Sequence, residues 1–294
     1  MSAIHKPVLL NEIIVFLNPE PGQNFIDCTF GGGGHSAEII KKIGPKGKLL
    51  AIDADPKTEV GSRVLGAGKA KVIFVNDNFR NLEKIVAENF SYPVKGILLD
   101  LGLSSDQLEN SGRGFTFQKD EPLDMRFDEK KETTAAEILN FGSLDYLINI
   151  FKNYGELRQA EKLARKVVEN RKCKKFQTTY DLIMAVEEAG VKARSPRINS
   201  ATLVFQALRI AVNDELNALK NVLPSAEKIL TPSGRLAVIS FQALEDRIVK
   251  NYFRDGARAK RFKLLTKKPV VPTRAEVLTN PRSRSAKLRV IEKI

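Results

Sequence analysis

Residues 26–36 read IDCTFGGGGHS. Four consecutive glycines follow a short apolar run that is typical of a strand, and they precede a segment with the pattern of a helix. The carboxyl ends of strands are where open α/β sheets bind their ligands, so a plain flexible spacer is not the favoured interpretation. The stretch therefore predicts a ligand-binding loop within a strand–loop–helix unit.

Two phosphate-binding motifs fit this loop poorly. The dinucleotide motif G-x-G-x-x-G, counted from Gly31, would need glycine where Ser36 stands, and a P-loop would need lysine where His35 stands. The D-x-x-x-G-x-G spacing from Asp27 to Gly33 instead resembles the first motif of S-adenosylmethionine-dependent methyltransferases. Glycine has no Cβ and permits close approach of the cofactor's methionine end, and the carboxylate complements its ammonium group.

A second strand-end carboxylate supports a nucleoside ligand. Asp53 ends the apolar run LLAID and stands twenty-two residues after Gly31. An acid at this place can accept hydrogen bonds from ribose hydroxyls. An NAD enzyme would use an acid there too, so Asp53 does not separate the two classes, and a solvated strand-end carboxylate is the plainer alternative.

The chain alternates strand and helix patterns up to Ser105 and again near its end. This alternation predicts βαβ units and a parallel sheet. Between the two parts helical patterns dominate, and 201–223 reads as one long amphipathic helix. We expect strands at 24–29, 48–53, 71–76, 94–102, 234–241 and 285–293, and helices at 35–43, 56–66 and 79–90.

The break after Ser105 indicates an α/β domain with a helical insertion. We expect a discontinuous sheet domain over 1–105 plus 200–294 and an inserted all-helical domain over 106–199. An insertion of this length is an ordinary domain size.

The charge of the chain indicates a polyanionic partner. The formal net charge is +13. The segment from Arg254 to the carboxyl terminus holds thirteen lysines and arginines against three acids, a net of +10. Nucleic acid is favoured over a membrane surface, because no long basic amphipathic helix accompanies these charges.

Cysteine and histidine usage argues against a disulfide framework and a zinc site. The chain has two cysteines, Cys28 and Cys173, and two histidines, His5 and His35. The amino-terminal apolar run is interrupted by polar residues, so it predicts neither a signal peptide nor a membrane span. We therefore expect a soluble cytoplasmic protein without a metal, with its oligomeric state, monomer or dimer, left open.

An ordered set of motifs resembles one family over nearly the whole chain. It is similar to the bacterial ribosomal RNA small subunit methyltransferase H family, the S-adenosylmethionine-dependent cytidine N4-methyltransferases. That resemblance implies a Rossmann-like class I methyltransferase sheet with a helical domain inserted after the fourth strand. The motifs are HKPVLLNE (5–12), IDCTFGGGGHS (26–36), LLAIDADP (49–56), ILLDLGLSSDQL (97–108), RGFTF (113–117), PLDMRF (122–127), FQALRIAVNDEL (205–216), ISFQALEDRIVK (239–250) and NPRSRSAKLR (280–289).

The resemblance implies a set of cofactor-binding residues. They are Gly33, Gly34, His35, Asp53, Phe79, Asp100 and Gln107. Phe79 could lie against the adenine face or be an ordinary core aromatic. His35 could bond the cofactor or cap its helix, and Gln107 could reach the cofactor or lie on a surface loop.

The substrate side carries a second set of candidates. Asp100 and Asp124 are the candidate catalytic residues, where Asp100 would serve either the cofactor or the target amine. Arg126, Arg282 and Arg284 are the candidates for RNA phosphates. A salt-bridged turn is the alternative for Asp124 and Arg126. The expected partner is ribosomal RNA or the small ribosomal subunit, with the target base flipped out of its stack.

The chain departs from the family's pattern mainly where the substrate would lie. Gln242 and Ala243 replace His-Ser, and Asn199, Ser200 and Leu203 replace His, Pro and Arg; Ala54 and Cys28 depart as well. Glutamine does not titrate and cannot act as a base. The alternative function is therefore a nucleic-acid-binding protein that keeps the cofactor pocket but has altered or lost activity.

Overall fold

The computed structural model describes residues 7–58, 70–192 and 199–294. These form two compact units, residues 1–102 with 216–294 and residues 103–215, which are described separately. The first is called the sheet unit and the second the helical unit. His5, Ile198 and most of the helix expected over 56–66 lie outside the described residues.

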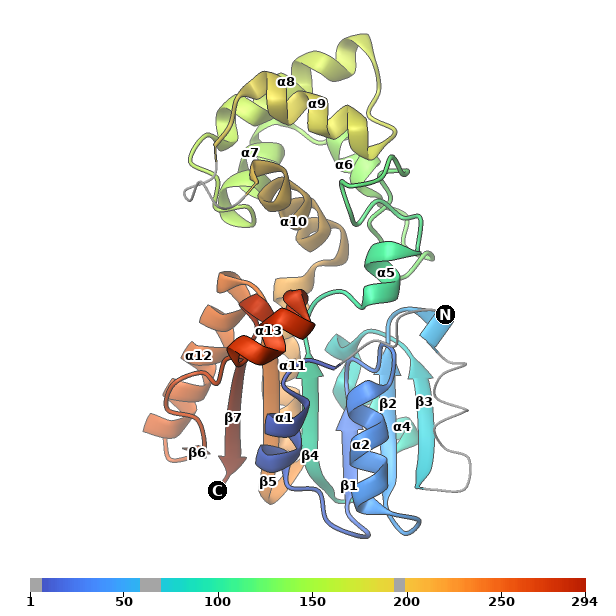
Figure 1. Cartoon of the computed structure of the whole chain (residues 1–294), viewed down its shortest axis with the longest axis vertical. Coiled ribbons are helices and arrows are strands. Elements are labelled where there is room, and N and C mark those ends of the chain that lie inside the picture. Colours follow the sequence, from blue (N-terminus) through green and yellow to red (C-terminus); the bar gives the residue numbers. More distant parts are fainter. Residues whose placement is uncertain (1–6, 59–69, 193–198) are drawn as a thin grey trace. The chain divides into compact units, whose positions relative to one another are not determined.

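The sheet unit contains a seven-stranded sheet with the order β3-β2-β1-β4-β5-β7-β6 (Figure 1). The first five strands in this order run parallel, and β7 is antiparallel to both of its neighbours. The chain order reverses between β1 and β4, so their carboxyl ends border the crevice where doubly wound sheets bind ligands. The strands are β1 (Asn24–Asp27), β2 (Lys48–Asp53), β3 (Lys71–Asn76), β4 (Val94–Asp100), β5 (Leu230–Ser240), β6 (Phe262–Leu264) and β7 (Lys287–Lys293).

Two apolar cores cover the two faces of this sheet. Side chains alternate between the faces along each strand, so Leu98 joins the core with α1 and α2, whereas Ile97 and Leu99 join the core with α4, α11 and α12. The helices of this unit are α1 (Leu10–Leu17), α2 (Gly34–Ile43), α4 (Leu82–Asn89), α11 (Glu215–Ile229), α12 (Ala243–Arg258) and α13 (Arg274–Thr279), with short 3₁₀ turns η1 (Pro56–Thr58), η2 (Phe79–Asn81) and η3 (Pro281–Ser285).

The helical unit has an apolar core of its own, which includes Leu139, Phe151, Leu163 and Leu182. The helices are α5 (Ser105–Glu109), α6 (Ala135–Phe141), α7 (Leu144–Asn153), α8 (Ala160–Cys173), α9 (Thr179–Ala189) and α10 (Ser200–Asn213). The helices α6, α7 and α10 begin at side-chain caps; Thr134, for example, forms a capping box with Glu137 at the start of α6.

The expectation of one long helix over 201–223 is wrong. The helix α10 ends at Asn213, Asp214 takes a left-handed conformation with φ of 54°, and α11 begins at Glu215. The Asn213 side chain accepts from the Phe127 N–H at 2.8 Å and donates to the Met125 carbonyl at 2.7 Å. These bonds fix the position of Asn213, and the next residue, Asp214, is of a type that tolerates the left-handed region.

This break also lies at the border of the two units. The sequence placed the borders after residues 105 and 199, whereas the compact units divide after Gly102 and Glu215. The helix α10 therefore packs with the inserted helices, and α11 packs on the sheet.

Candidate active site

The glycine loop joins β1 to α2 at the point where the strand order reverses. Gly31 and Gly33 have φ of 50° and 71°, in the left-handed region that disfavours a side chain. Gly34 is needed for a different reason, because a Cβ on it would lie 2.7 Å from Cγ of Pro7. The amino-terminal segment therefore packs against the start of α2, and the loop exposes backbone without side chains.

Asp27 lies beneath this loop and is 1% exposed. The Ser36 hydroxyl donates to its Oδ2 at 2.6 Å, and the Thr29 N–H donates to its Oδ1 at 3.1 Å. Burial raises the pKa of Asp27. Both carboxylate oxygens thus accept hydrogen bonds from the loop and α2, so Asp27 holds the loop's two sides together rather than facing the crevice.

Asp53 ends β2 and contacts the same loop. Its Oδ2 accepts the Gly31 N–H at 2.7 Å, and its Oδ1 accepts the Asp55 N–H at 2.8 Å. Burial raises the pKa of Asp53 to about 6. A carboxylate has about four lone-pair sites, so Asp53 can still accept the two hydroxyls of a ribose.

His35 and Asp100 meet at the ends of α2 and β4. The Nε2 of His35 donates to the Val8 carbonyl at 2.9 Å, and its Nδ1 lies 3.7 Å from Oδ2 of Asp100. The backbone N–H of Asp100 donates to the Thr29 hydroxyl at 2.6 Å. Sequence reasoning gave Val8 and Thr29 no part in the site; no signal in their local pattern identifies them.

Asp100 carries a buried oxygen, Oδ1, that has no hydrogen-bond partner among the residues the structure describes. Burial, with the nearby carboxylates of Asp27 and Glu245 acting in the same direction, raises the pKa of Asp100 to about 8. A buried acceptor without a partner is costly and marks a place where a donor can bind. Asp100 is therefore a candidate acceptor for an N–H or O–H group of a ligand.

Gln242 and Glu245 form a second polar group at the end of β5. Gln242 Nε2 donates to Glu245 Oε1 at 3.0 Å, while Glu245 Oε2 accepts the N–H groups of Phe241 and Gln242 at 2.9 and 3.2 Å. Glu245 is buried. Its spacing of three residues from Gln242 resembles the helix-capping pattern, so this signal was available in the sequence.

Phe79 and Gln107 contact neighbouring residues of their own units. Phe79 opens η2 after β3 and packs, partly buried, against the core that includes α4. Gln107 belongs to the helical unit, where its Oε1 accepts the Ser104 N–H and its own N–H donates to the Ser104 hydroxyl, both at 3.1 Å. Their cofactor roles stay predictions.

Asp124 and Arg126 form a bidentate ion pair in the helical unit. The Nε of Arg126 donates to Oδ1 of Asp124 at 2.7 Å and its Nη2 donates to Oδ2 at 2.8 Å. Burial alone would raise the pKa of Asp124, but the hydrogen bonds and charge of Arg126 outweigh it and the pKa is lowered. Arg126 also donates to the carbonyls of Glu129 and Lys131. Their proposed catalytic and phosphate-binding roles stay predictions.

Arg282 and Arg284 lie on η3 in the sheet unit, and both are exposed. The neighbouring helix α13 is tied to the amino-terminal segment, because the Leu9 N–H donates to Oε1 of Glu276 at 2.8 Å. The segment that packs on the glycine loop thus contacts the basic carboxyl-terminal region as well.

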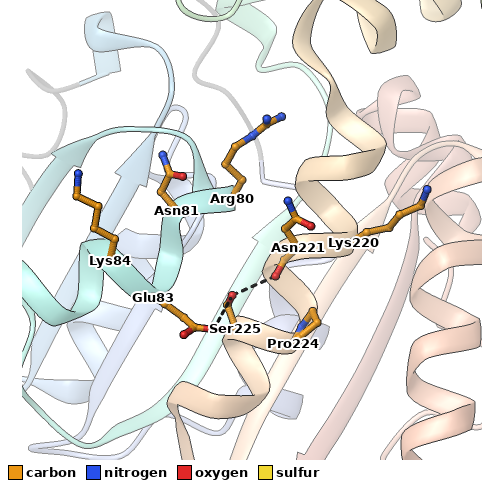
Figure 2. Close-up of a pocket in the computed structure, with 8 residues that line it drawn as sticks. All are labelled: Arg80, Asn81, Glu83, Lys84, Lys220, Asn221, Pro224 and Ser225. Atoms are coloured by element: carbon orange, nitrogen blue, oxygen red, sulfur yellow. Dashed lines mark hydrogen bonds between the residues drawn. The ribbon is translucent and has the colours of Figure 1, made fainter.

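A shallow groove of about 470 Å³ lies between the start of α4 and the middle of α11 (Figure 2). Its one acid, Glu83, accepts from the Ser225 hydroxyl at 3.2 Å and pairs with Lys228 at 2.7 Å. The groove is lined by Arg80, Asn81, Glu83, Lys84, Lys220, Asn221, Pro224 and Ser225. The charged side chains of this lining are therefore mainly basic.

Most positions that depart from the family's pattern have ordinary local contacts. The Asn199 side chain accepts the Ala201 N–H at 2.9 Å and caps α10. Leu203 packs, partly buried, on the core of the helical unit, and Ala243 is exposed at the start of α12. Cys28 is buried, and both cysteines are free. Gln242 is the exception, because its buried Oε1 has no partner among the described residues.

The glycine loop, Asp53 and Asp100 together fit S-adenosylmethionine. The Asp53 carboxylate and the Asp100 Oδ1 offer acceptors to the cofactor's hydroxyl and ammonium donors, on either side of a loop whose glycines leave the backbone open. The loop has neither the third glycine of the dinucleotide motif nor the lysine of a P-loop. The sheet order, with its reversed last strand, and this acceptor-lined loop define a class I S-adenosylmethionine-dependent methyltransferase.

Comparisons with known proteins agree with this class. The sequence profile described as the MraW methylase family matches residues 2–294. The ribosomal RNA small subunit methyltransferase H of Thermomicrobium roseum is 44% identical, covering 100% of this chain and 95% of the relative. The protein of the same name from Clostridioides difficile is 40% identical, covering 100% of both chains. The chain belongs to the MraW methylase family.

Among solved structures, a putative rRNA-methylase from Clostridium thermocellum covers 98% of both chains with a TM-score of 0.47 and 14% identity. This likeness is too low to add to the assignment, which rests on the sequence matches.

Two further observations concern membranes and metal ions. Among the described residues, no helix is both long and apolar enough to cross a membrane. The same residues contain no group of three or more His, Cys, Asp or Glu side chains that could hold a metal ion.

Proposed function

We propose that this chain transfers a methyl group from S-adenosylmethionine to N4 of a cytidine in the decoding region of small-subunit ribosomal RNA. The observation that carries the proposal is the buried Asp100 Oδ1 beside the glycine loop, which awaits a donor at the crevice of the sheet. Family membership and the printed names of the relatives support the substrate class.

The chain's own groups would bind the cofactor and orient it. Asp53 would accept the ribose hydroxyls, and the backbone from Gly31 to Gly34 would approach the methionine end. Bound S-adenosylmethionine supplies an activated methyl group, so positioning is the main contribution required of the protein. Asp100 ends the strand next to the loop, where it can accept from the cofactor or from the target amine.

RNA would bind through basic surfaces of the sheet unit. Arg282 and Arg284 are exposed on η3, and the groove of Figure 2 adds Arg80, Lys84 and Lys220. Cations of this kind contact phosphates without reading sequence. We propose that the inserted helical domain, over 106–199, supplies the recognition of the substrate, and that the protein acts in the cytoplasm.

A methylation assay tests the function directly. Purified protein is incubated with labelled S-adenosylmethionine and small ribosomal subunits or their RNA, and the modified nucleotide is mapped. The expected result is incorporation at N4 of one decoding-region cytidine. No incorporation into RNA or subunits, together with measurable cofactor binding, would contradict the proposal.

That outcome would favour the second candidate, a nucleic-acid-binding protein without turnover. The observation in its favour is Gln242, whose amide cannot take a proton at the end of β5. Cofactor and RNA affinities measured separately would then both be retained while transfer is absent.

A further inference from the structure

Two buried acceptor atoms of the sheet unit have no hydrogen-bond partner among the described residues. They are Oδ1 of Asp100 and Oε1 of Gln242. Asp100 is the last residue of β4, and Gln242 follows the end of β5, the strand that pairs with β4 in parallel register with Asp100 opposite Ile239. The two acceptors therefore belong to the carboxyl ends of adjacent strands.

The orientation of the Gln242 amide is determined by its neighbour. Glu245 Oε1 lies 3.0 Å from Gln242 Nε2. A carboxylate only accepts hydrogen bonds, so the NH₂ group must face it and the carbonyl oxygen must face away. Glu245 is itself held by the backbone N–H groups of Phe241 and Gln242. Gln242 thus directs its carbonyl oxygen away from Glu245 Oε1.

The strand order separates this acceptor from the cofactor's ribose. The glycine loop follows β1 and Asp53 ends β2, whereas β4 and β5 lie on the other side of β1. A cofactor that contacts the β1 and β2 ends leaves the β5 end for the molecule that receives the methyl group. Asp100 lies between the two regions, because its N–H bonds Thr29 of the loop.

We propose that Gln242 contacts the methyl-accepting base directly, with its Oε1 accepting one N–H of an exocyclic amine while Asp100 Oδ1 accepts the other. Two acceptors match the two hydrogens of an NH₂ group. Uracil has a carbonyl oxygen where cytosine has this amine, and two acceptors repel that oxygen. The site therefore selects cytosine and rejects uracil. This proposal rests on the proposed function and adds the group that reads the base.

The chemical step balances with these residues. As the amine nitrogen bonds to the methyl carbon, the carbon–sulfur bond breaks and its electron pair leaves with the sulfur, which becomes a neutral thioether. The nitrogen then carries one proton too many, and that proton passes to the Asp100 carboxylate and on to solvent. Gln242 accepts a hydrogen bond throughout and takes no proton.

The first test measures base preference without turnover. The full-length protein is loaded with S-adenosylhomocysteine, and binding of cytidine and uridine monophosphates is measured by calorimetry. We expect the wild type to prefer cytidine monophosphate about 10-fold or more. Gln242→Leu should reduce this preference to about twofold or less, with unchanged affinity for S-adenosylhomocysteine.

Gln23→Leu is the matched control. Gln23 is also an amide that donates to a carboxylate three residues away, with Nε2 at 2.9 Å from Oε2 of Glu20, but it precedes β1 at the opposite edge of the sheet. This variant should keep the full preference. Thermal unfolding of both variants confirms that they fold.

Glu245 is a positioning residue in this scheme. Glu245→Ala should lower the preference for cytidine monophosphate, because the amide of Gln242 is then free to turn. Glu245→Gln keeps an acceptor for the amide and should recover part of the preference, which a purely structural role would not predict.

Two results would overturn the inference. One is a wild-type protein that binds the two nucleotides equally, and the other is a folded Gln242→Leu protein that keeps the preference. Both are distinct from failure of the proposed function, which is judged by methyl incorporation into ribosomal RNA with the wild-type protein.

Discussion

At the residue scale, the site is organised by carboxylates with unlike environments. Asp27 accepts hydrogen bonds from Ser36 and Thr29, Asp53 shares its oxygens with two backbone N–H groups, and Asp100 has an oxygen without a partner among the described residues. Residues of one type therefore differ in what they can still bind. The strand-end pattern predicted that acids would gather here, but the division of tasks among them depends on hydrogen bonds between distant segments.

Asp53→Ala should abolish most of the affinity for S-adenosylmethionine. The variant loses the acceptors for the ribose hydroxyls, and hydrogen bonds to charged groups contribute about 1.5–3 kcal/mol each, so a loss of about 10²-fold or more is expected. Calorimetry with S-adenosylhomocysteine measures it. Asp145→Ala, in the first turn of α7, is the control for a carboxylate outside the site. Unchanged affinity in Asp53→Ala would mean that the ribose lies elsewhere.

Asp100 should make the stability of the ligand-free protein depend on pH. Its pKa rises from 3.8 to about 8 on folding, so its stabilising contribution is complete below about pH 4 and is lost as the pH rises through 8. The groups that face it are the carboxylates of Asp27 and Glu245 and the ring of His35.

Asp100→Asn removes this charge. The melting temperature of the variant relative to the wild type should therefore increase between pH 5 and pH 9. The expected increase is a few degrees, which corresponds to about 1–2 kcal/mol in the free energy of unfolding. Thermal unfolding at several pH values measures the difference. A difference that is constant with pH would show that Asp100 titrates normally.

The same ionisation should appear in the kinetics. The Asp100 carboxylate can accept the proton of the methylated amine only when it is ionised. The value of kcat/KM for S-adenosylmethionine, which reports groups of the protein without the cofactor, should therefore rise with pH up to about 8 and level off. A flat profile from pH 6 to 9 would exclude Asp100 as the proton acceptor.

At the element scale, the amino-terminal segment packs on the glycine loop. Gly34→Ala would place a Cβ 2.7 Å from Cγ and 3.2 Å from Cδ of Pro7. Overpacking of this kind costs about 1–3 kcal/mol. We expect a lower melting temperature and weaker cofactor binding, because the loop and the segment must move apart.

Pro7→Ala provides the rescue for that variant. It removes the two nearest atoms and leaves Cβ at 3.3 Å from the added methyl group. The double variant should therefore recover part of the lost stability, with a coupling energy opposite in sign to the loss. Additive effects in the double-mutant cycle would contradict a direct clash.

Element boundaries show where sequence patterns succeed and fail. The strands predicted at 48–53 and 71–76 are β2 and β3 with the same limits, because both are short apolar runs bounded by polar residues. The helix predicted over 201–223 is broken at Asp214, since the apolar periodicity continues across the junction. The break depends on the bonds of Asn213 to Phe127 and Met125, which are 86 and 88 residues away along the chain. The strand β6 was not predicted, because three residues are too few to show an apolar pattern.

At the scale of the whole molecule, the excess positive charge should govern RNA binding. Arg282→Ala with Arg284→Ala removes two exposed cations of η3. Each phosphate contact with single-stranded nucleic acid contributes about 0.7 to the slope of log affinity against log salt concentration, so the slope should fall by about 1 to 2. Fluorescence anisotropy with a ribosomal RNA fragment over a salt series measures it.

The matched control removes two lysines from the amino edge of the sheet. Lys42 lies in the last turn of α2, and Lys46 lies in the turn before β2. Both side chains are exposed. Lys42→Ala with Lys46→Ala changes the net charge equally and should leave the slope close to that of the wild type. Equal effects from the two double variants would show that only the total charge matters.

Local sequence patterns predicted the fold class, the place of the glycine loop and the strand-end acids Asp53 and Asp100. Apolar periodicity and glycine spacing are local properties, and the strand ends of a parallel sheet meet at one edge. Folding determined that Ser36 and Thr29 bond Asp27, that Asn213 bonds Phe127 at the break between α10 and α11, and that Asp100 Oδ1 has no partner among the described residues. Those assignments depend on which polar atoms meet after folding and which buried acceptors remain, and no local pattern carries that information.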